Sequence, residues 1–319
     1  MLQGRFASGR YTSTVLFVLS MSVILTAYWL PVTGTGAMRH SIPVLSDGFV
    51  PRFVSALIYA FAAILLSRQI FFDRGVKWMG ALYLWLVAIS TFINGNPYIA
   101  FSSLLFLLSL LLLFQCQYSA NPVGPLYTSF VLLGALVFVM PYSLYIIPLF
   151  WIFGFFANVF SPKGVAASLL GLATPIWLLC GTAYVLPAAD ALLGQIVAYL
   201  HPVFEVELPD FSILFMLQLL LALAVLLPAI FSFVGSASPS KPLLRRRMSF
   251  VMVADVYLLL LFCLTAGGTS FFYVCQLPIL AVLATFLFAQ KETRLSNVYF
   301  VFVNIIMVAV ATYPLWSIH

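Results

Sequence analysis

Long apolar runs follow one another along almost the whole chain. A transmembrane helix needs about 20 predominantly apolar residues to cross a hydrocarbon core of roughly 30 Å. We therefore expect an all-α protein, a polytopic transmembrane bundle of about 11 spans. The predicted spans are Thr12–Pro31, Phe53–Phe71, Trp78–Ile93, Tyr98–Gln115, Tyr127–Met140, Tyr142–Asn158, Gly164–Pro187, Phe211–Val234, Phe250–Gly267, Phe271–Gln290 and Leu295–Pro314.

The composition excludes a soluble globule. Of the 319 residues, 64% are hydrophobic and 7% are charged, whereas about a quarter of the residues in a soluble domain are charged. A formal net charge of +6 would favour nucleic acid as the partner of a soluble protein, but in membrane proteins Lys and Arg gather in cytoplasmic loops. We expect one integral membrane domain over residues 1–319, with the lipid bilayer as a partner and no nucleic acid.

Basic residues predict the orientation of the chain. With the N-terminus in the cytoplasm, all of the 14 Lys and Arg residues except Arg39 and Arg52 fall on the cytoplasmic side. If residues 127–158 formed a single span, Lys163 and the basic residues from Lys241 to Arg247 would fall outside the cytoplasm. The bias therefore supports a turn at Pro141 that divides residues 127–158 into two short helices. Proline also disfavours the helical conformation in the residue before it. The C-terminus then lies outside the cytoplasm.

Residues 188–210 form a predicted extracytoplasmic loop with a helix of its own. Asp190 can cap that helix, and His201-Pro202 ends it. Its apolar residues with few polar neighbours suit a helix that lies along the membrane interface.

A basic cluster precedes the ninth predicted span. It consists of Lys241, Arg245, Arg246 and Arg247. A cluster of this kind on the cytoplasmic side orients the chain and contacts anionic lipid headgroups. We expect a headgroup-binding site there, and a specific partner site is the alternative.

Asp255 is the one acidic residue deep inside a predicted span. Insertion of such a residue costs about 2.5–3.5 kcal/mol, so it marks a candidate functional site. It follows Arg247 by eight residues, about 12 Å along a helix, which places it in the cytoplasmic leaflet. A proton or cation relay would use this carboxylate. The alternatives are that it reaches the interface, pairs with Lys or Arg, or accepts hydrogen bonds from Tyr or Ser on a neighbouring helix.

The first outer loop holds residues that permit chemistry. Asp47 lies between Arg39 and Arg52, and His40 is close in sequence. A carboxylate can act as a general base, while Arg and His can neutralise a phosphate leaving group. Phosphate loops, HExxH and clustered His and Cys are absent from the sequence, so we expect no cofactor and no metal.

Two resemblances accompany these residues. The loop around Asp47, and the stretch Val131–Phe160 followed by Ser161-Pro162-Lys163-Gly164, resemble the C-type, lipid-sugar-dependent glycosyltransferases, which implies a catalytic acid in the first extracytoplasmic loop. Asp47 nevertheless lies about 16 residues beyond the first helix. The layout of Tyr127–Trp177 and Leu277–Asn304 is similar to an uncharacterised family of polytopic bacterial inner-membrane proteins, which implies that location and no reaction.

Three functions remain open. The scarcity of polar groups within the spans favours a non-catalytic subunit or scaffold of an envelope assembly or export complex, with protein partners in the membrane. A glycosyltransferase-like enzyme that uses Asp47 is the first alternative, and a proton-coupled transporter that uses Asp255 is the second.

Overall fold

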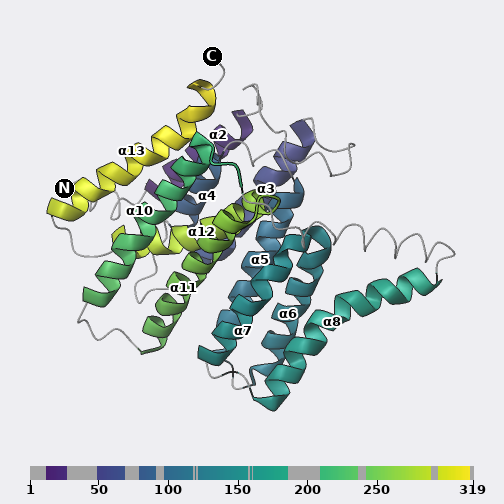
Figure 1. Ribbon diagram of the computed structural model, residues 1–319. Helices are drawn as coiled ribbons and strands as arrows, with labels where there is room; N and C mark the ends of the chain where they lie inside the picture. Colours follow the sequence, from purple (N-terminus) through teal and green to yellow (C-terminus); the bar gives the residue numbers. More distant parts are fainter. Residues whose placement is uncertain are drawn as a thin grey trace. The chain divides into compact units, whose positions relative to one another are not determined.

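The part of the chain that the structure describes is helical throughout. It is a computed structural model that describes residues 12–26, 49–68, 79–90, 97–117, 119, 121–156, 159, 161–185, 209–235, 242–288 and 294–316. Eleven α-helices and one 3-10 helix, η2, occur in these residues, without a strand among them (Figure 1). The elements are α2 (Thr12–Thr26), α3 (Phe49–Arg68), α4 (Met79–Ile89), α5 (Pro97–Gln115), α6 (Val123–Val139), η2 (Pro141–Ile146), α7 (Ile147–Phe156), α8 (Pro162–Val185), α10 (Ile213–Gly235), α11 (Pro242–Leu264), α12 (Thr269–Phe288) and α13 (Arg294–Trp316).

Each predicted apolar run coincides with one of these helices, so the all-α prediction is confirmed. Within the described residues, six helices are long and apolar enough to cross a membrane, namely α3, α5, α8, α10, α11 and α12. This length and composition indicate a multi-pass membrane protein. The count of eleven spans and the orientation of the termini stay predictions. Residues 188–208, which include the predicted interfacial helix, lie outside the described residues.

Helices α3 and α11 begin before their apolar runs, at residues that the sequence placed in loops. Helix α3 starts at Phe49, so Arg52 lies in its first turn and not in the loop where the sequence placed it. Helix α11 starts at Pro242, so the three arginines that follow are helical as well. Proline is favoured in the first turn, where its missing N–H group would have no partner in the helix. Helical hydrogen bonds do not need apolar side chains, and the apolar run therefore marks only the part of each helix that lipid can surround.

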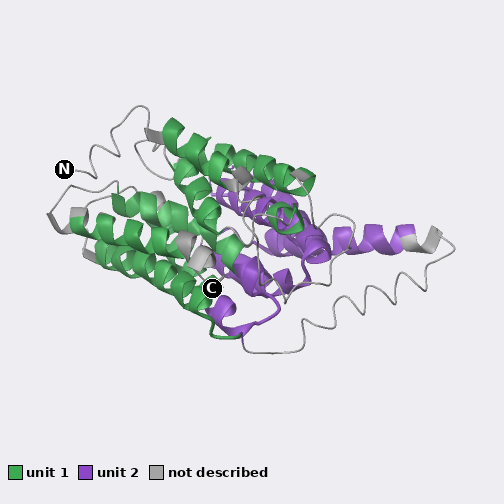
Figure 2. Cartoon of the chain, turned by 90° about the horizontal axis from the view of Figure 1, so that it is seen from above, with its two compact units in different colours: residues 1–101, 210–259, 273–319 green, residues 102–209, 260–272 purple. Residues whose placement is uncertain are grey.

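The chain forms two compact units, which Figure 2 colours separately. Unit 1 comprises Met1–Phe101, Asp210–Leu259 and Tyr273–His319. In unit 1, α4 packs against α2, α3 and α13, and α10 packs against α13. The Tyr299 hydroxyl of α13 donates a hydrogen bond to the Ala224 carbonyl of α10.

Unit 2 comprises Ser102–Pro209 and Leu260–Phe272. Its helices α6 and α8 run in the same direction, because successive residues of α6 approach successive residues of α8: Leu126 approaches Gly164, Phe130 approaches Gly171, and Gly134 approaches Pro175. The segment between them, η2 and α7, must therefore run in the opposite direction, so the chain reverses after α6. It does so at Met140, whose backbone is extended at φ −142° and ψ 102°, as the proline at 141 predicts.

Glycines allow α6 and α8 to approach closely. A Cβ atom at Gly171 would lie 2.7 Å from the Tyr127 carbonyl oxygen and 2.8 Å from the Phe130 Cβ atom. A Cβ at Gly134 would lie 3.0 Å from the Leu172 carbonyl oxygen. The hydroxyl groups of Tyr127 and Thr174 lie 3.0 Å apart beside this contact. Small residues with an interhelical hydrogen bond are the usual way in which membrane helices associate.

We predict that Gly171→Ala destabilises the fold by about 1–3 kcal/mol, because the added methyl group overlaps backbone that cannot move without separating the helices. The matched control on the same helix is Gly181→Ala, where an added Cβ meets nothing within 4 Å. It should be neutral, or stabilising by up to about 1 kcal/mol from helix propensity. Thermal unfolding of the purified variants in detergent measures both, and equal melting temperatures would contradict the packing.

Candidate functional site

The structure describes only some of the residues that the sequence offered for function. Asp47, Arg39, His40 and Lys241 lie outside the described residues. Arg52 is half-buried in the first turn of α3. The outer-loop constellation is therefore not tested, and neither is its chemistry.

Asp255 lies deep inside its helix and inside unit 1. Its side chain has an exposed fraction of 0%, as has the adjacent Ala254. The apolar part of α11 that could cross a membrane begins at Arg245, so Asp255 follows ten residues later. This is about 15 Å along the axis, well inside the part of α11 that could cross a membrane. The carboxyl group does not reach the protein surface.

One hydrogen bond connects Asp255 to the next helix. The Gln276 Nε2 atom of α12 donates to the Asp255 Oδ1 atom at 2.9 Å. Among the alternatives from the sequence, a hydrogen bond from a neighbouring helix is the nearest, although the donor is an amide and not Tyr or Ser. The Asp255 Oδ2 and Gln276 Oε1 atoms are buried without a hydrogen-bond partner. Two acceptor oxygens are thus available to a proton, a water molecule or a cation.

The same turn of α12 lies close to polar groups of two further helices. Ser90 at the end of α4 places its Oγ atom 3.4 Å from the Tyr273 hydroxyl. Tyr59 of α3 lies within electrostatic range of Cys275 and of Tyr83 on α4, and its hydroxyl is buried without a partner. The turn Tyr273–Gln276 therefore gathers polar groups from α3, α4 and α11. We call Asp255, Gln276, Tyr273, Ser90 and Tyr59 the polar centre of unit 1.

The sequence identified one member of this centre. Gln276 and Tyr59 were missed, although a signal existed, since both are polar residues within apolar runs. Buried polar atoms without partners are few in folded proteins, and each one asks for an explanation such as a bound water or ion. The unpartnered oxygens of Asp255 and Gln276 therefore make the polar centre the strongest candidate site in unit 1.

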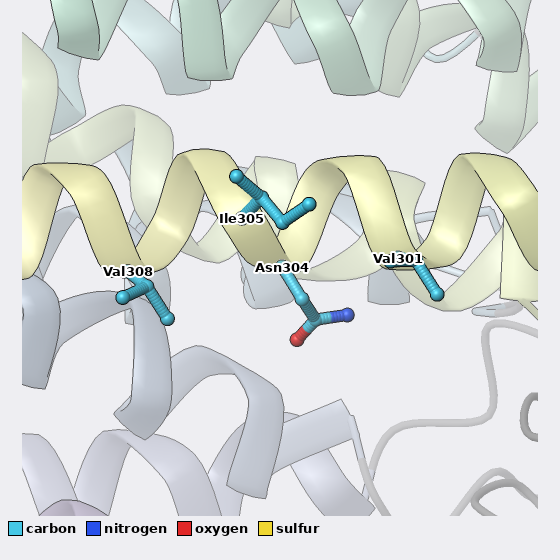
Figure 3. A pocket seen from close by; sticks show the side chains of 4 residues that line it. All are labelled: Val301, Asn304, Ile305 and Val308. Atoms are coloured by element: carbon cyan, nitrogen blue, oxygen red, sulfur yellow. The ribbon is translucent and has the colours of Figure 1, made fainter.

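An open groove lies along α13. It has a volume of about 310 Å³ and is lined by Val301, Asn304, Ile305 and Val308 (Figure 3). These residues follow one face of a single helix, and Figure 3 shows the Asn304 amide among apolar side chains. A shallow apolar surface on one helix suits lipid chains better than a small polar substrate.

The second half of α8 is exposed around its circumference. Helix α8 contains Pro175, and its later part runs away from α6 (Figure 1). Trp177 has an exposed fraction of 77%, and its neighbours Ile176 and Leu178 are also exposed. A Cβ atom added at Gly181 would meet nothing within 4 Å. This half-helix has no packing partner within the described part of unit 2 and presents an apolar surface to its surroundings.

Among the described residues, no three His, Cys, Asp or Glu side chains lie close enough together to hold a metal ion. Comparison with protein-family models, with curated proteins and with solved structures gives no match to this chain. The two resemblances drawn from the sequence therefore stay predictions.

We predict that Gln276→Leu lowers the free energy of unfolding by about 1–3 kcal/mol, because it leaves the buried Asp255 carboxyl without its donor. Asp255→Asn should cost less, since the new amide still accepts from Gln276 and adds a donor for an unpartnered oxygen. The double variant Asp255→Leu/Gln276→Leu should recover most of the loss, because both polar groups are then gone. Thermal or chemical unfolding in detergent measures the free energy of unfolding of each single variant and of the double variant. Additive losses would contradict coupling between the two side chains.

Proposed function

We propose that this chain is a non-catalytic subunit or scaffold of an envelope assembly or export complex in a bacterial inner membrane. The observation that carries the proposal is the exposed second half of α8, where Ile176, Trp177 and Leu178 point in three directions about the helix axis and are all exposed. The partner that fits this surface is an apolar transmembrane helix of another protein.

Two features favour a protein partner over lipid alone. Gly181 leaves open space beside α8, and membrane helices approach one another at small residues. The Thr182 hydroxyl, close to Gly181, donates to the Leu179 carbonyl of its own helix, so it places no unsatisfied group in the contact. In unit 2 the glycines at 134 and 171 already receive a neighbouring helix in this way, and Gly181 offers a second place for such a contact.

A photocrosslinking residue at position 177 tests this surface in the native membrane. We expect a discrete adduct with one membrane protein, and the same protein should co-purify with the unmodified chain in mild detergent. Gly181→Leu should lower this co-purification by about tenfold, because the side chain fills the space that the partner backbone needs. Gly124→Leu is the control, since Gly124 on α6 is equally open. A monodisperse lone chain that gives no adduct from position 177 would refute the proposal.

The polar centre favours a second candidate, a proton-coupled transporter. An ionisable side chain at the middle of a transmembrane helix is expensive and usually lies on a proton or ion path. The Asp255 Oδ2 atom has no partner that competes with an incoming proton.

Proteoliposomes containing a trapped pH-sensitive dye test the transporter. Asp255→Asn should abolish proton movement under an imposed pH gradient, because the amide cannot carry the proton. Asp210→Asn is the matched control, since Asp210 is exposed beside α10. Proton movement that survives Asp255→Asn unchanged would exclude this candidate. The glycosyltransferase alternative stays a prediction, because Asp47 lies outside the described residues.

A further inference from the structure

The arginines of α11 stand where its membrane-crossing part begins. That apolar part starts at Arg245. The side chains of Arg245 and Arg246 are exposed, whereas Arg247 is 5% exposed. Two exposed guanidinium groups therefore stand at the first turn of the part of α11 that could cross a membrane.

An aromatic ring holds one of these groups in place. The Arg245 Cζ atom lies 5.7 Å from the centroid of the Phe233 ring. Phe233 in turn packs edge-on against Phe286, with ring centroids 6.5 Å apart and an interplanar angle of 61°. A guanidinium group over a ring face gains cation–π attraction while its N–H groups stay in its own plane, where they can reach an acceptor.

The boundary of the apolar region is the same on both helices. The membrane-crossing part of α10 ends at Val234, one residue beyond the ring that contacts Arg245. Phe231 and Val234 near this end are each 75% exposed. The end of α10 that contacts Arg245 therefore also carries exposed apolar side chains, as a ligand with a charged head and acyl chains requires.

The local electrostatics favour an anion at this place. The start of a helix carries a partial positive charge, so acidic residues are favoured there and basic residues are not. The first turn of α11 contains no acidic residue, and three arginines follow within the next turn. An anion between the helix start and the guanidinium groups would relieve their mutual repulsion.

We propose that Arg245 and Arg246, with Phe233 as the support of Arg245, bind the phosphate headgroup of an anionic phospholipid. The phosphate accepts hydrogen bonds from the two guanidinium groups, and the acyl chains lie against the exposed side chain of Val234. This site does not depend on the proposed function, because it uses neither α8 nor the polar centre.

Native mass spectrometry of the purified chain, titrated with phosphatidylglycerol or phosphatidylcholine, tests the site. Arg245→Gln/Arg246→Gln should weaken phosphatidylglycerol binding by about 25-fold, from about fivefold for each charge near the membrane surface. Binding of phosphatidylcholine, which is zwitterionic, should hardly change. Phe233→Leu keeps both charges but removes the ring, and should weaken phosphatidylglycerol binding by about two- to fivefold.

Two controls distinguish lipid binding at this site from a general effect of positive charge on the protein. Arg68→Gln/Lys163→Gln removes two other exposed basic groups and should leave phosphatidylglycerol binding intact. Arg245→Lys/Arg246→Lys keeps the charge and should retain most of the binding, and it carries the test if the glutamine variant fails to fold. Equal losses in the Arg68/Lys163 control, no loss in the Arg245/Arg246 glutamine variant, or displacement of the lipid by inorganic phosphate at low millimolar concentration would each overturn the proposal.

Discussion

A polar group surrounded by hydrocarbon must find its hydrogen-bond partner within the protein, and this constraint shapes every described helix. The backbone satisfies it by forming α-helices. Many hydroxyl side chains satisfy it within their own helix, by donating to the carbonyl oxygen four residues earlier. Hydroxyls that do so include those of Ser20, Ser55, Ser67, Ser90, Thr128, Thr174, Ser249 and Thr265.

Carboxylate and amide side chains lack this solution, because a carboxylate accepts without donating and an amide has both donors and an acceptor to satisfy. Asp255 and Gln276 are therefore joined across two helices, and each still has an oxygen without a partner. The same helix, α11, carries Asp255 at its middle and the exposed arginines at its start. A helix moves as a rigid rod, so a shift of α11 against the headgroups would also move Asp255 against α12.

The positions of the helices could be predicted from the sequence because transmembrane length and apolarity are local properties of the chain. The break at Met140 was predictable for the same reason, since Pro141 restricts the residue before it. The starts of α3 and α11 were not, because Arg52 and the arginines after Pro242 are helical without being apolar.

Contacts between helices could not be predicted from local patterns in the sequence. Gln276 lies 21 residues from Asp255, and nothing in the spacing selects it over other polar residues in neighbouring helices. The contact of Gly171 with the backbone of α6 likewise depends on the direction in which α6 and α8 run. For the candidate site, the sequence identified the costly carboxylate, and the structure was needed to find what surrounds it.

The break at Met140 leaves α6 with 17 residues, which rise about 25 Å along the helix axis. A typical bilayer core is about 30 Å thick. If α6 crosses the membrane, the bilayer must be thinner beside it, at a cost of a fraction of a kcal/mol per Å of mismatch. Lipids with shorter acyl chains would reduce this cost, so they should collect next to α6.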